Sequence, residues 1–192
     1  MNYDVWKPTT SLTAGPNSPL NDSCAAPQDR NGSAVSAVRA WNAAGIPLNN
    51  IVLGVAGYGH SFNVSPANAY QPPGGAGSEL ALFPPFNATG QPPGDAWDNP
   101  PGMDACGNPV GQGGIWQFWG LVQAGYLKSD GTPTNEVVYR YDNCSQTVSW
   151  FASSYFDRKR TFYTLPALAE CWVFFVLTAV YIQGGRADPD IL

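Results

Sequence analysis

The first six residues, MNYDVW, place a phenol, a carboxylate and an indole close together in the chain, at Tyr3, Asp4 and Trp6. Side chains of these types normally lie at the mouth of a binding site, where aromatic faces pack on a ligand and polar ends make hydrogen bonds. A capped strand end is the alternative interpretation of Tyr3 and Asp4, and the residues alone favour neither.

Further candidates follow later in the chain. His60, the single histidine, comes two residues after Tyr58. It is either a site residue or a structural, hydrogen-bonded or solvent-facing histidine. The helical spacing of Trp116 and Trp119 favours a place in a core, whereas Trp97 lies in a predicted loop and is the better candidate for ligand contact.

Composition narrows the class of protein. The 192 residues suffice for one domain with a real core. Only 12% of residues are charged and the net charge is -5, which argues against a nucleic-acid partner. Aromatic residues make up 13%, and Tyr and Trp suit sugar rings as well as cores. The 21 glycines and 18 prolines predict many turns and loops.

Two features favour passage through a secretory pathway, although Asp4 and Lys7 interrupt any apolar export signal at the start. Asn-X-Ser/Thr acceptor sequences recur along the chain. Four cysteines without C-x-x-C spacing favour one or two disulfides over a zinc site, with a buried free thiol as the alternative. No metal, nucleotide or redox cofactor is predicted. The acceptors are Asn21, Asn31, Asn63, Asn87 and Asn143, and the cysteines are Cys24, Cys106, Cys144 and Cys171.

The pattern along the first 62 residues predicts a βαβ unit with a parallel sheet. Residues 1–6 are the first strand. A helix follows Ser33, a plausible N-cap, and stops near Gly45. The apolar run 51–55 is predicted to be a strand buried on both faces.

The rest of the chain divides into three parts. Residues 63–114 are loop-like, which is typical of a functional insertion or a disordered segment. A short helix over 113–127 and a strand over 137–142 complete a small α+β subdomain. Residues 165–182 are nearly all apolar but contain Glu170, so a buried helix or strand is favoured over a membrane anchor; a segment foreign to the ancestral domain is a third interpretation.

Three motifs together resemble a known family. They are M-x-Y-D ending at Asp4, the run LGVAGYGHSF over 53–62, and GGIW-x-F over 113–118. Their order and spacing resemble glycoside hydrolase family 18, the chitinases and chitinase-like lectins, most closely secreted fungal members, over residues 1–147.

The resemblance implies an α/β fold, the C-terminal part of a (β/α)8 TIM barrel with a small α+β insertion subdomain. Residues 1–62 would hold barrel strands six and seven with the crossover helix, and 63–147 the insertion. Residues 148–192 would be a divergent C-terminal segment, in which a retained intron or frameshift replaces the last barrel strand. Met1 would then be internal to a longer protein. Because Cys106 and Cys144 flank the presumed insertion, their pairing is favoured among the three possible ones.

The resemblance also implies a reaction. In this family the N-acetyl oxygen of the sugar attacks its own anomeric carbon while a glutamic acid protonates the leaving oxygen. The Tyr3 hydroxyl would orient the acetamido group, Asp4 would bind polar groups of the sugar, and Met1 would line the pocket floor. Tyr58 and Trp97 are further substrate-binding candidates, at the ends of strands where TIM-barrel sites form or in the insertion.

Three departures from the family pattern limit this interpretation. The acid closes a D-x-x-D-x-D-x-E motif that is absent here, since Glu79, Glu136 and Glu170 lack the preceding aspartates. The chain is therefore expected to be inactive alone, part of an extracellular chitinase; a lectin-like chitin binder without hydrolysis is the alternative, and a wall- or membrane-associated protein a third. His60 replaces the arginine of Y-G-R-S-F, and Lys7 stands where glycine is usual.

Overall fold

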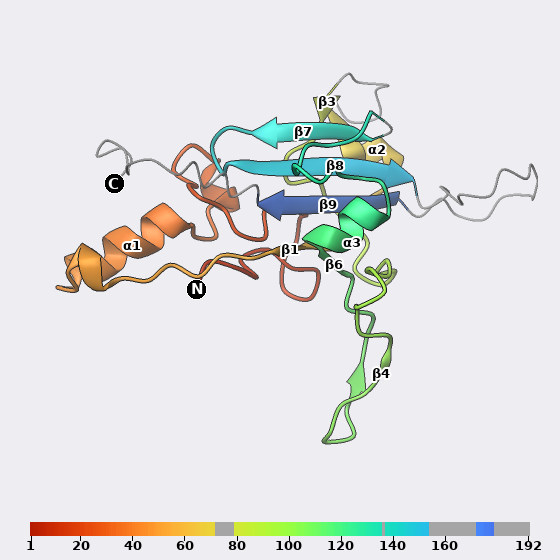
Figure 1. Ribbon diagram of the computed structural model, residues 1–192, viewed down its shortest axis with the longest axis horizontal. Helices are drawn as coiled ribbons and strands as arrows, with labels where there is room; N and C mark the ends of the chain where they lie inside the picture. Colours follow the sequence, from red (N-terminus) through yellow and green to blue (C-terminus); the bar gives the residue numbers. More distant parts are fainter. Residues whose placement is uncertain (72–78, 136, 154–171, 179–192) are drawn as a thin grey trace, which may run out of the picture.

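The computed structural model describes residues 1–71, 79–135, 137–153 and 172–178. Its main feature is a five-stranded sheet with the order β6-β1-β9-β8-β7, in which every neighbouring pair is antiparallel (Figure 1). The strands are β1 (Tyr58–Asn63), β6 (Ile115–Gln117), β7 (Val138–Asp142), β8 (Thr147–Ser153) and β9 (Trp172–Thr178). The sheet therefore joins segments that lie about a hundred residues apart in the chain.

The expected strand over 137–142 is confirmed as β7. It continues into β8 through a tight turn that the Asp142 carboxylate organises, accepting hydrogen bonds from the backbone N–H groups of Cys144 and Ser145, each at 3.1 Å. A side chain that bonds to its own following backbone is a common way to hold a turn.

The main core forms where β1 ends. Phe62 and Val64 are fully buried there with Leu80, and the ring of Phe86 packs edge-on against Phe62 at 5.0 Å between centroids. Leu80 lies in β3 (Glu79–Leu80), which pairs with β2 (Tyr70–Gln71) directly after the short helix α2 (Pro66–Ala69). The loop that follows β1 is thus folded back over the end of the strand.

The predicted helix is confirmed as α1 (Ala34–Ala43). Ser33 is its N-cap and forms a reciprocal capping box with Ser36, which satisfies backbone N–H groups that the first helical turn leaves open. Val35 is buried, but Trp41 is 58% exposed, and Figure 1 shows α1 extending sideways from the sheet. Only the first turn of the helix is therefore packed.

The expected strand over 51–55, buried on both faces, is wrong. Its one bridge to another described segment joins it to the start of the chain, through a parallel pairing of Asn2 with Val55 and a 2.7 Å hydrogen bond from the Asn2 N–H to the Gly54 carbonyl. Val52 is 91% exposed. The parallel order of the βαβ prediction is present at this bridge, but no described layer covers the apolar run. The first strand predicted for residues 1–6 is likewise reduced to this bridge, and Val5 instead bonds to the Asn17 carbonyl at 3.1 Å.

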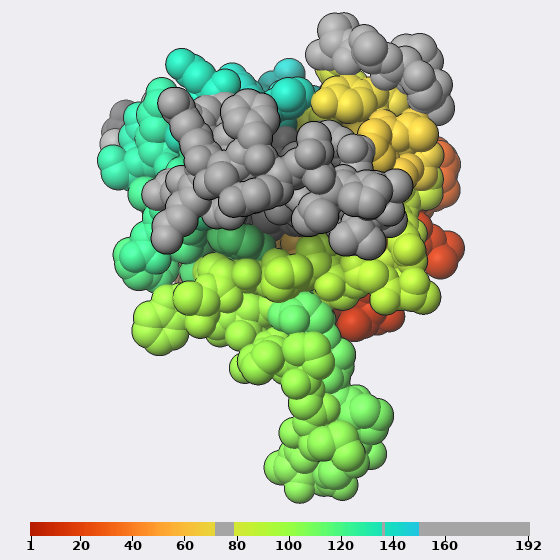
Figure 2. Space-filling view, turned by 90° about the vertical axis from the view of Figure 1, so that its right-hand side faces the viewer, coloured from red at the N-terminus to blue at the C-terminus, as the bar shows by residue number. Residues whose placement is uncertain are grey.

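The loop-like character predicted for 63–114 agrees with the structure. Beyond α2, β2 and β3, the described part of this stretch forms an isolated bridge of Pro85 with Thr13 and a small hairpin of β4 (Gly102–Met103) and β5 (Pro109–Val110). Figure 2 shows the hairpin as a lobe that protrudes from the body of the molecule. Two single 3-10 turns, Pro27–Asp29 and Leu48–Asn50, lie on either side of α1.

The expected helix over 113–127 is shorter than predicted. Residues 115–117 are strand β6, and the helix α3 covers Phe118–Gln123. Trp116 therefore lies on the strand, half-buried against Leu121 and stacked edge-on with Tyr126 at 5.6 Å. Trp119 is exposed. A common helix face for Trp116 and Trp119 is wrong, because only one of them is helical.

The apolar stretch 165–182 contributes β9, which lies between β1 and β8. A strand was one of the two structures that the sequence favoured for this stretch. Residues 165–171, which include Glu170, and residues 179–182 fall outside the described part, and so do residues 184–192. Among the described helices, none has the length and apolar character that crossing a bilayer requires.

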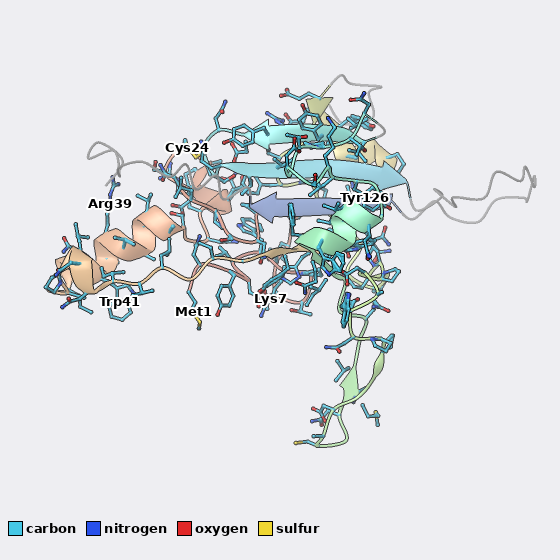
Figure 3. All side chains as sticks on the ribbon, in the orientation of Figure 1. Met1, Lys7, Cys24, Arg39, Trp41 and Tyr126 are labelled. Atoms are coloured by element: carbon cyan, nitrogen blue, oxygen red, sulfur yellow. A yellow bond between two sulfur atoms is a disulfide. The ribbon has the colours of Figure 1, made fainter. Side chains whose placement is uncertain are left out.

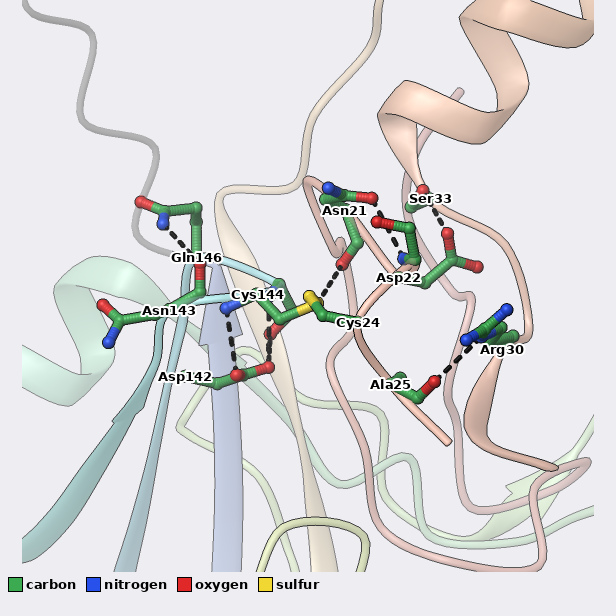
Figure 4. The surroundings of a disulfide bond; sticks show 12 residues. Asn21, Asp22, Cys24, Ala25, Arg30, Ser33, Asp142, Asn143, Cys144 and Gln146 are labelled. Carbon is green, nitrogen blue, oxygen red and sulfur yellow. Dashed lines mark hydrogen bonds between the residues drawn. A yellow bond between two sulfur atoms is a disulfide. The ribbon is translucent and has the colours of Figure 1, made fainter. Parts of the chain in front are cut away.

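One disulfide joins Cys24 to Cys144, and Cys106 is free and exposed, so the expected pairing of Cys106 with Cys144 is wrong (Figure 4). The reason is the protruding hairpin: Cys106 lies in the β4–β5 turn, away from the β7–β8 turn that carries Cys144. The bond instead fastens the loop before α1 to the sheet across 120 residues of sequence.

Candidate functional site

The structure brings two of the sequence motifs together at the carboxylate of Asp4. The Tyr58 hydroxyl donates a hydrogen bond to Asp4 Oδ1 at 2.6 Å, and His60 Nε2 lies 2.9 Å from the same oxygen. Tyr58 and His60 are two residues apart on β1 and contact each other edge-on, with ring centroids 5.7 Å apart. The sequence left the role of His60 open, and the structure shows it as a buried residue that is hydrogen-bonded to Asp4.

Asp4 occupies an unusual backbone conformation, with φ of 57°, in the left-handed region that side chains other than glycine seldom adopt. Asn17 holds it there. The fully buried Asn17 accepts a hydrogen bond from the Asp4 N–H through Oδ1 and donates one through Nδ2 to the Tyr58 carbonyl, both at 2.8 Å. The Asn17 amide thus fixes the backbone of both Asp4 and Tyr58, the two residues whose side chains then meet.

The sequence pattern does not indicate Asn17 as a site residue. An asparagine in a loop rich in Pro, Gly and Ser is typical of a turn residue, and nothing in the local pattern marks it as buried. A second buried amide, Asn2, lies nearby and donates to the Pro19 carbonyl at 2.9 Å, while Ser18 and Asn2 also bond to each other. Segment 1–18 is therefore held by side-chain hydrogen bonds to backbone.

The charges at this contact are set by burial and hydrogen bonding. Burial lowers the pKa of His60, against the opposing attraction of Asp4, so the imidazole is neutral near pH 7 and its Nε2–H donates to the carboxylate. Desolvation raises the pKa of Asp4, but hydrogen bonds from Tyr58 and His60 outweigh it and hold the pKa below its ordinary value. Burial and the neighbouring carboxylate raise the pKa of the Tyr58 phenol.

One polar atom of this group is left over. His60 Nδ1 is buried and has no hydrogen-bond partner within the part of the chain that the structure describes. With the proton on Nε2, this nitrogen is an acceptor. His60 therefore bonds to Asp4 through Nε2, while its Nδ1 has no donor among the described residues.

Tyr3 and Met1 lie beside this contact. The rings of Tyr3 and Tyr58 meet edge-on with centroids 6.4 Å apart, and the Tyr3 hydroxyl contacts the sulfur of Met1. Met1 is 90% exposed and lies at the lower edge of the body in Figure 3. Four of the five predicted substrate-binding residues, Met1, Tyr3, Asp4 and Tyr58, therefore form one group.

The fifth, Trp97, lies on a separate turn and is 72% exposed. Asp95 holds that turn by accepting hydrogen bonds from the N–H groups of Trp97, at 2.9 Å, and Gln117, at 2.7 Å. Gln117 on β6 is paired with Tyr58 on β1. The structure thus tethers the backbone of the Trp97 turn to the strand beside Tyr58, and a ligand-contacting role for its ring stays a prediction.

Glu79, the one described glutamate, does not join the group. Glu79 forms an ion pair with Arg140 at 3.3 Å, and Glu136 and Glu170 fall outside the described residues. Within the described part, no three His, Cys, Asp or Glu side chains cluster as metal ligands would. The described group is a carboxylate hydrogen-bonded to Tyr58 and His60, with the Tyr3 ring beside that of Tyr58, which suits binding of a polar, ring-shaped ligand.

Two relatives match the sequence over most of this chain. It is 55% identical over 147 residues to a chitinase-like effector of Moniliophthora roreri and 54% identical over 145 residues to one of Moniliophthora perniciosa. These matches cover 77% and 76% of this chain. The crystal structure of the chitinase RmChi1 from Rhizomucor miehei matches with a TM-score of 0.60 at 30% identity, over 78% of this chain. The chain belongs to glycoside hydrolase family 18, the chitinases and chitinase-like proteins.

This family 18 chain spans 35% and 32% of the length of the two effectors and 37% of RmChi1. A more distant fold match is the Ostrinia furnacalis Group IV chitinase in complex with allosamidin, with a TM-score of 0.52 at 18% identity, over 90% of this chain and 34% of that one. No protein-family model matches the sequence. Family 18 chitinases have TIM-barrel folds, whereas the described residues here form small sheets and no closed barrel.

Proposed function

We propose that the group around Asp4 forms one side of a binding site for chitin oligosaccharides, β-1,4-linked polymers of N-acetylglucosamine. The observation that carries the proposal is the Asp4 carboxylate, fixed by Tyr58 and His60 on one side and by Asn17 through its backbone. Both carboxylate contacts end on Oδ1, so Oδ2 is the oxygen proposed to accept hydrogen bonds from the sugar.

In this proposal the Tyr3 hydroxyl donates to the acetamido oxygen of the sugar and orients it toward the anomeric carbon. Family membership supports this role, since family 18 hydrolysis is substrate-assisted and retaining. Orientation alone lowers the barrier for attack, but the leaving oxygen still needs a proton. The D-x-x-D-x-D-x-E acid is not in this sequence, so the chain alone is proposed to bind and orient the sugar without cutting it.

A second candidate function is carbohydrate binding without hydrolysis in the whole protein, as in a lectin. The name of the two relatives, chitinase-like effector, favours it. In either case the protein is proposed to act outside the cell, which its acceptor asparagines and its disulfide support. The two candidates share the oligosaccharide and differ only in whether the bond is cleaved.

Titration calorimetry of the purified chain with N-acetylglucosamine hexamers tests the binding site. We expect Asp4→Ala to weaken binding by about tenfold or more, because one charged hydrogen bond contributes about 1.5–3 kcal/mol. Tyr3→Phe should weaken it less. Glu79→Gln is the matched control, since this carboxylate lies in an exposed ion pair outside the site and its loss should leave the affinity unchanged. Equal affinity of Asp4→Ala and wild type would refute the site.

Release of reducing ends from the same hexamers tests whether the chain by itself cuts the sugar that it binds. The chain is expected to release none above background at concentrations where it binds. Cleavage by the chain would overturn the assignment of binding without cutting, even if the Asp4 site were confirmed by calorimetry.

A further inference from the structure

Two of the acceptor sequences meet in space although 24 positions separate them. The backbone N–H of Asn87 donates to the carbonyl of Asn63 at 2.8 Å. Asn63 ends β1, and Asn87 lies in the loop that crosses the end of that strand. The two asparagines therefore share one backbone environment while their side chains differ, which allows a direct comparison.

The Asn63 side chain is enclosed. It is 9% exposed, and Nδ2, the atom that would carry a sugar, donates to the Gly90 carbonyl at 3.0 Å. Packing there is tight, because a Cβ added at Gly90 would lie 2.6 Å from this nitrogen. An oligosaccharide on Asn63 would have to displace the Gly90 backbone, so this acceptor is closed in the folded chain.

The Asn87 side chain is open. All three residues of its acceptor sequence, Asn87, Ala88 and Thr89, are exposed. Asn87 Oδ1 accepts hydrogen bonds from the N–H of Thr89 at 3.0 Å and from its hydroxyl at 2.7 Å. Both bonds use the carbonyl end of the amide, so neither occupies Nδ2. Asn87 is also the one acceptor in the sequence with threonine in the third position.

Two other acceptor sequences have their third residue engaged in the fold; Figure 4 shows the first of these residues, Ser33, beside Asp22. After Asn31, the buried Ser33 donates its hydroxyl to Asp22 at 2.7 Å and caps α1. After Asn143, the buried Ser145 bonds to Asp142. A modifying enzyme that needs this hydroxyl would have to compete with these bonds.

Asn21 and Asn143 also lie beside the disulfide. The Asn21 carbonyl contacts the sulfur of Cys144 at 3.7 Å, and Cys144 is the middle residue of the Asn143 acceptor. Asn21 itself is half-buried. Closure of the disulfide therefore restricts these two positions, and Asn87 is left as the acceptor that the fold exposes throughout.

We propose that Asn87 is an N-glycosylation site of this protein and that Asn63 is not. In the transfer, Nδ2 of Asn87 forms a bond to the anomeric carbon of an oligosaccharide carried on a lipid diphosphate. The bond from that carbon to the diphosphate oxygen breaks, the lipid diphosphate leaves with the electron pair, and the amide gives up one proton. This inference goes beyond the proposed function and does not depend on it.

The test is secretion of the full chain from a yeast host behind a cleavable leader, followed by glycosidase treatment in heavy-oxygen water and peptide mass spectrometry. The peptide with Asn87 is expected to carry the label of a removed glycan, and the peptide with Asn63 is not. Recovery of Asn87 unmodified in the secreted chain, or of Asn63 modified, overturns the proposal.

Two matched variants remove the acceptor sequences without changing either asparagine. Thr89→Ala should abolish the label at Asn87, and Thr89→Ser should keep it. Ser65→Ala removes the Asn63 acceptor at an exposed residue whose side chain caps nothing, and should leave the total glycan unchanged. A loss of glycan in Ser65→Ala, or its persistence at Asn87 in Thr89→Ala, contradicts the assignment.

Discussion

The amino-terminal loop (residues 1–18) and the α1 arm (residues 34–55) meet at the Asn2–Val55 bridge but differ in the polar side chains that they bury. The loop buries polar side chains, Asn2, Asn17 and Ser18, each paired with backbone or with each other. The arm leaves apolar side chains such as Trp41 and Val52 in solvent. Directional hydrogen bonds fix the group around Asp4, and apolar burial contributes little on the arm side.

The difference matters for the proposed site. An apolar contact tolerates small shifts, whereas a buried amide with two backbone partners has one geometry in which both bonds form. Asn17 joins Asp4 to Tyr58 in this way, and it therefore holds the carboxylate where Tyr58 and His60 reach it.

The largest effect is expected from Asn17→Ala. It removes the hydrogen-bond partner of the Asp4 N–H and of the Tyr58 carbonyl. Unsatisfied buried groups cost about 1–3 kcal/mol each, so we expect a loss of about 2–6 kcal/mol in the free energy of unfolding. Urea denaturation followed by tryptophan fluorescence measures it. The exposed Asn49→Ala is the control, and a similar loss there would remove the contrast between loop and arm.

A smaller effect separates the two ends of α1. Val35→Ala, at the buried first turn, should lower the free energy of unfolding by about 1–2 kcal/mol. Trp41→Ala, near the other end of the helix, should change it by less than about 0.5 kcal/mol, because the indole is exposed. Equal losses in the two variants would show that the far end of the arm is packed after all.

The smallest effect concerns pH. The pKa of folded His60 lies below the 6.5 of an unperturbed histidine, so the unfolded chain takes up the proton first and stability falls as pH drops below about 6.5. The pKa of folded Asp4 lies below 3.8, so its contribution is lost in a second window beneath that value. Lys7 and Asp98 also act on His60, the first lowering its pKa and the second raising it.

The measurement is the urea midpoint between pH 4 and 8 for wild type and His60→Gln. Because the chain has one histidine, the variant should flatten the slope below about 6.5 while its amide can still donate to Asp4. An unchanged slope would mean that His60 is not buried in the neutral form.

Local patterns predicted the parts of the fold that local interactions decide. Ser33 caps α1 because an N-cap needs only the next three residues, and β7 follows from its alternating side chains. The prediction of a buried strand over 51–55 was wrong, because a continuous apolar run is buried only if other layers of the fold cover it. The place of β9 between β1 and β8 depends on long-range pairing that no local signal encodes.

The residues of the candidate site also fall into those that local motifs predicted and those that only tertiary contacts reveal. Tyr3, Asp4 and Tyr58 were found through motifs, and the structure groups them. The residues that position them were not predicted from motifs. The role of His60 was left open, and Asn17 was missed because only tertiary contacts reveal that an amide in a loop is buried. The cysteine pairing was likewise beyond sequence, since any of three combinations fits the spacing.

The bond between Cys24 and Cys144 closes a covalent ring around the polypeptide from one cysteine to the other. The protruding β4–β5 hairpin is the part of that ring most open to a protease, and a nick there would leave both pieces joined through sulfur. After such a cut, the piece that contains Asp4 and β1 would stay covalently attached to the piece that contains β7 and β8. A reductant that opens the disulfide would remove this covalent link.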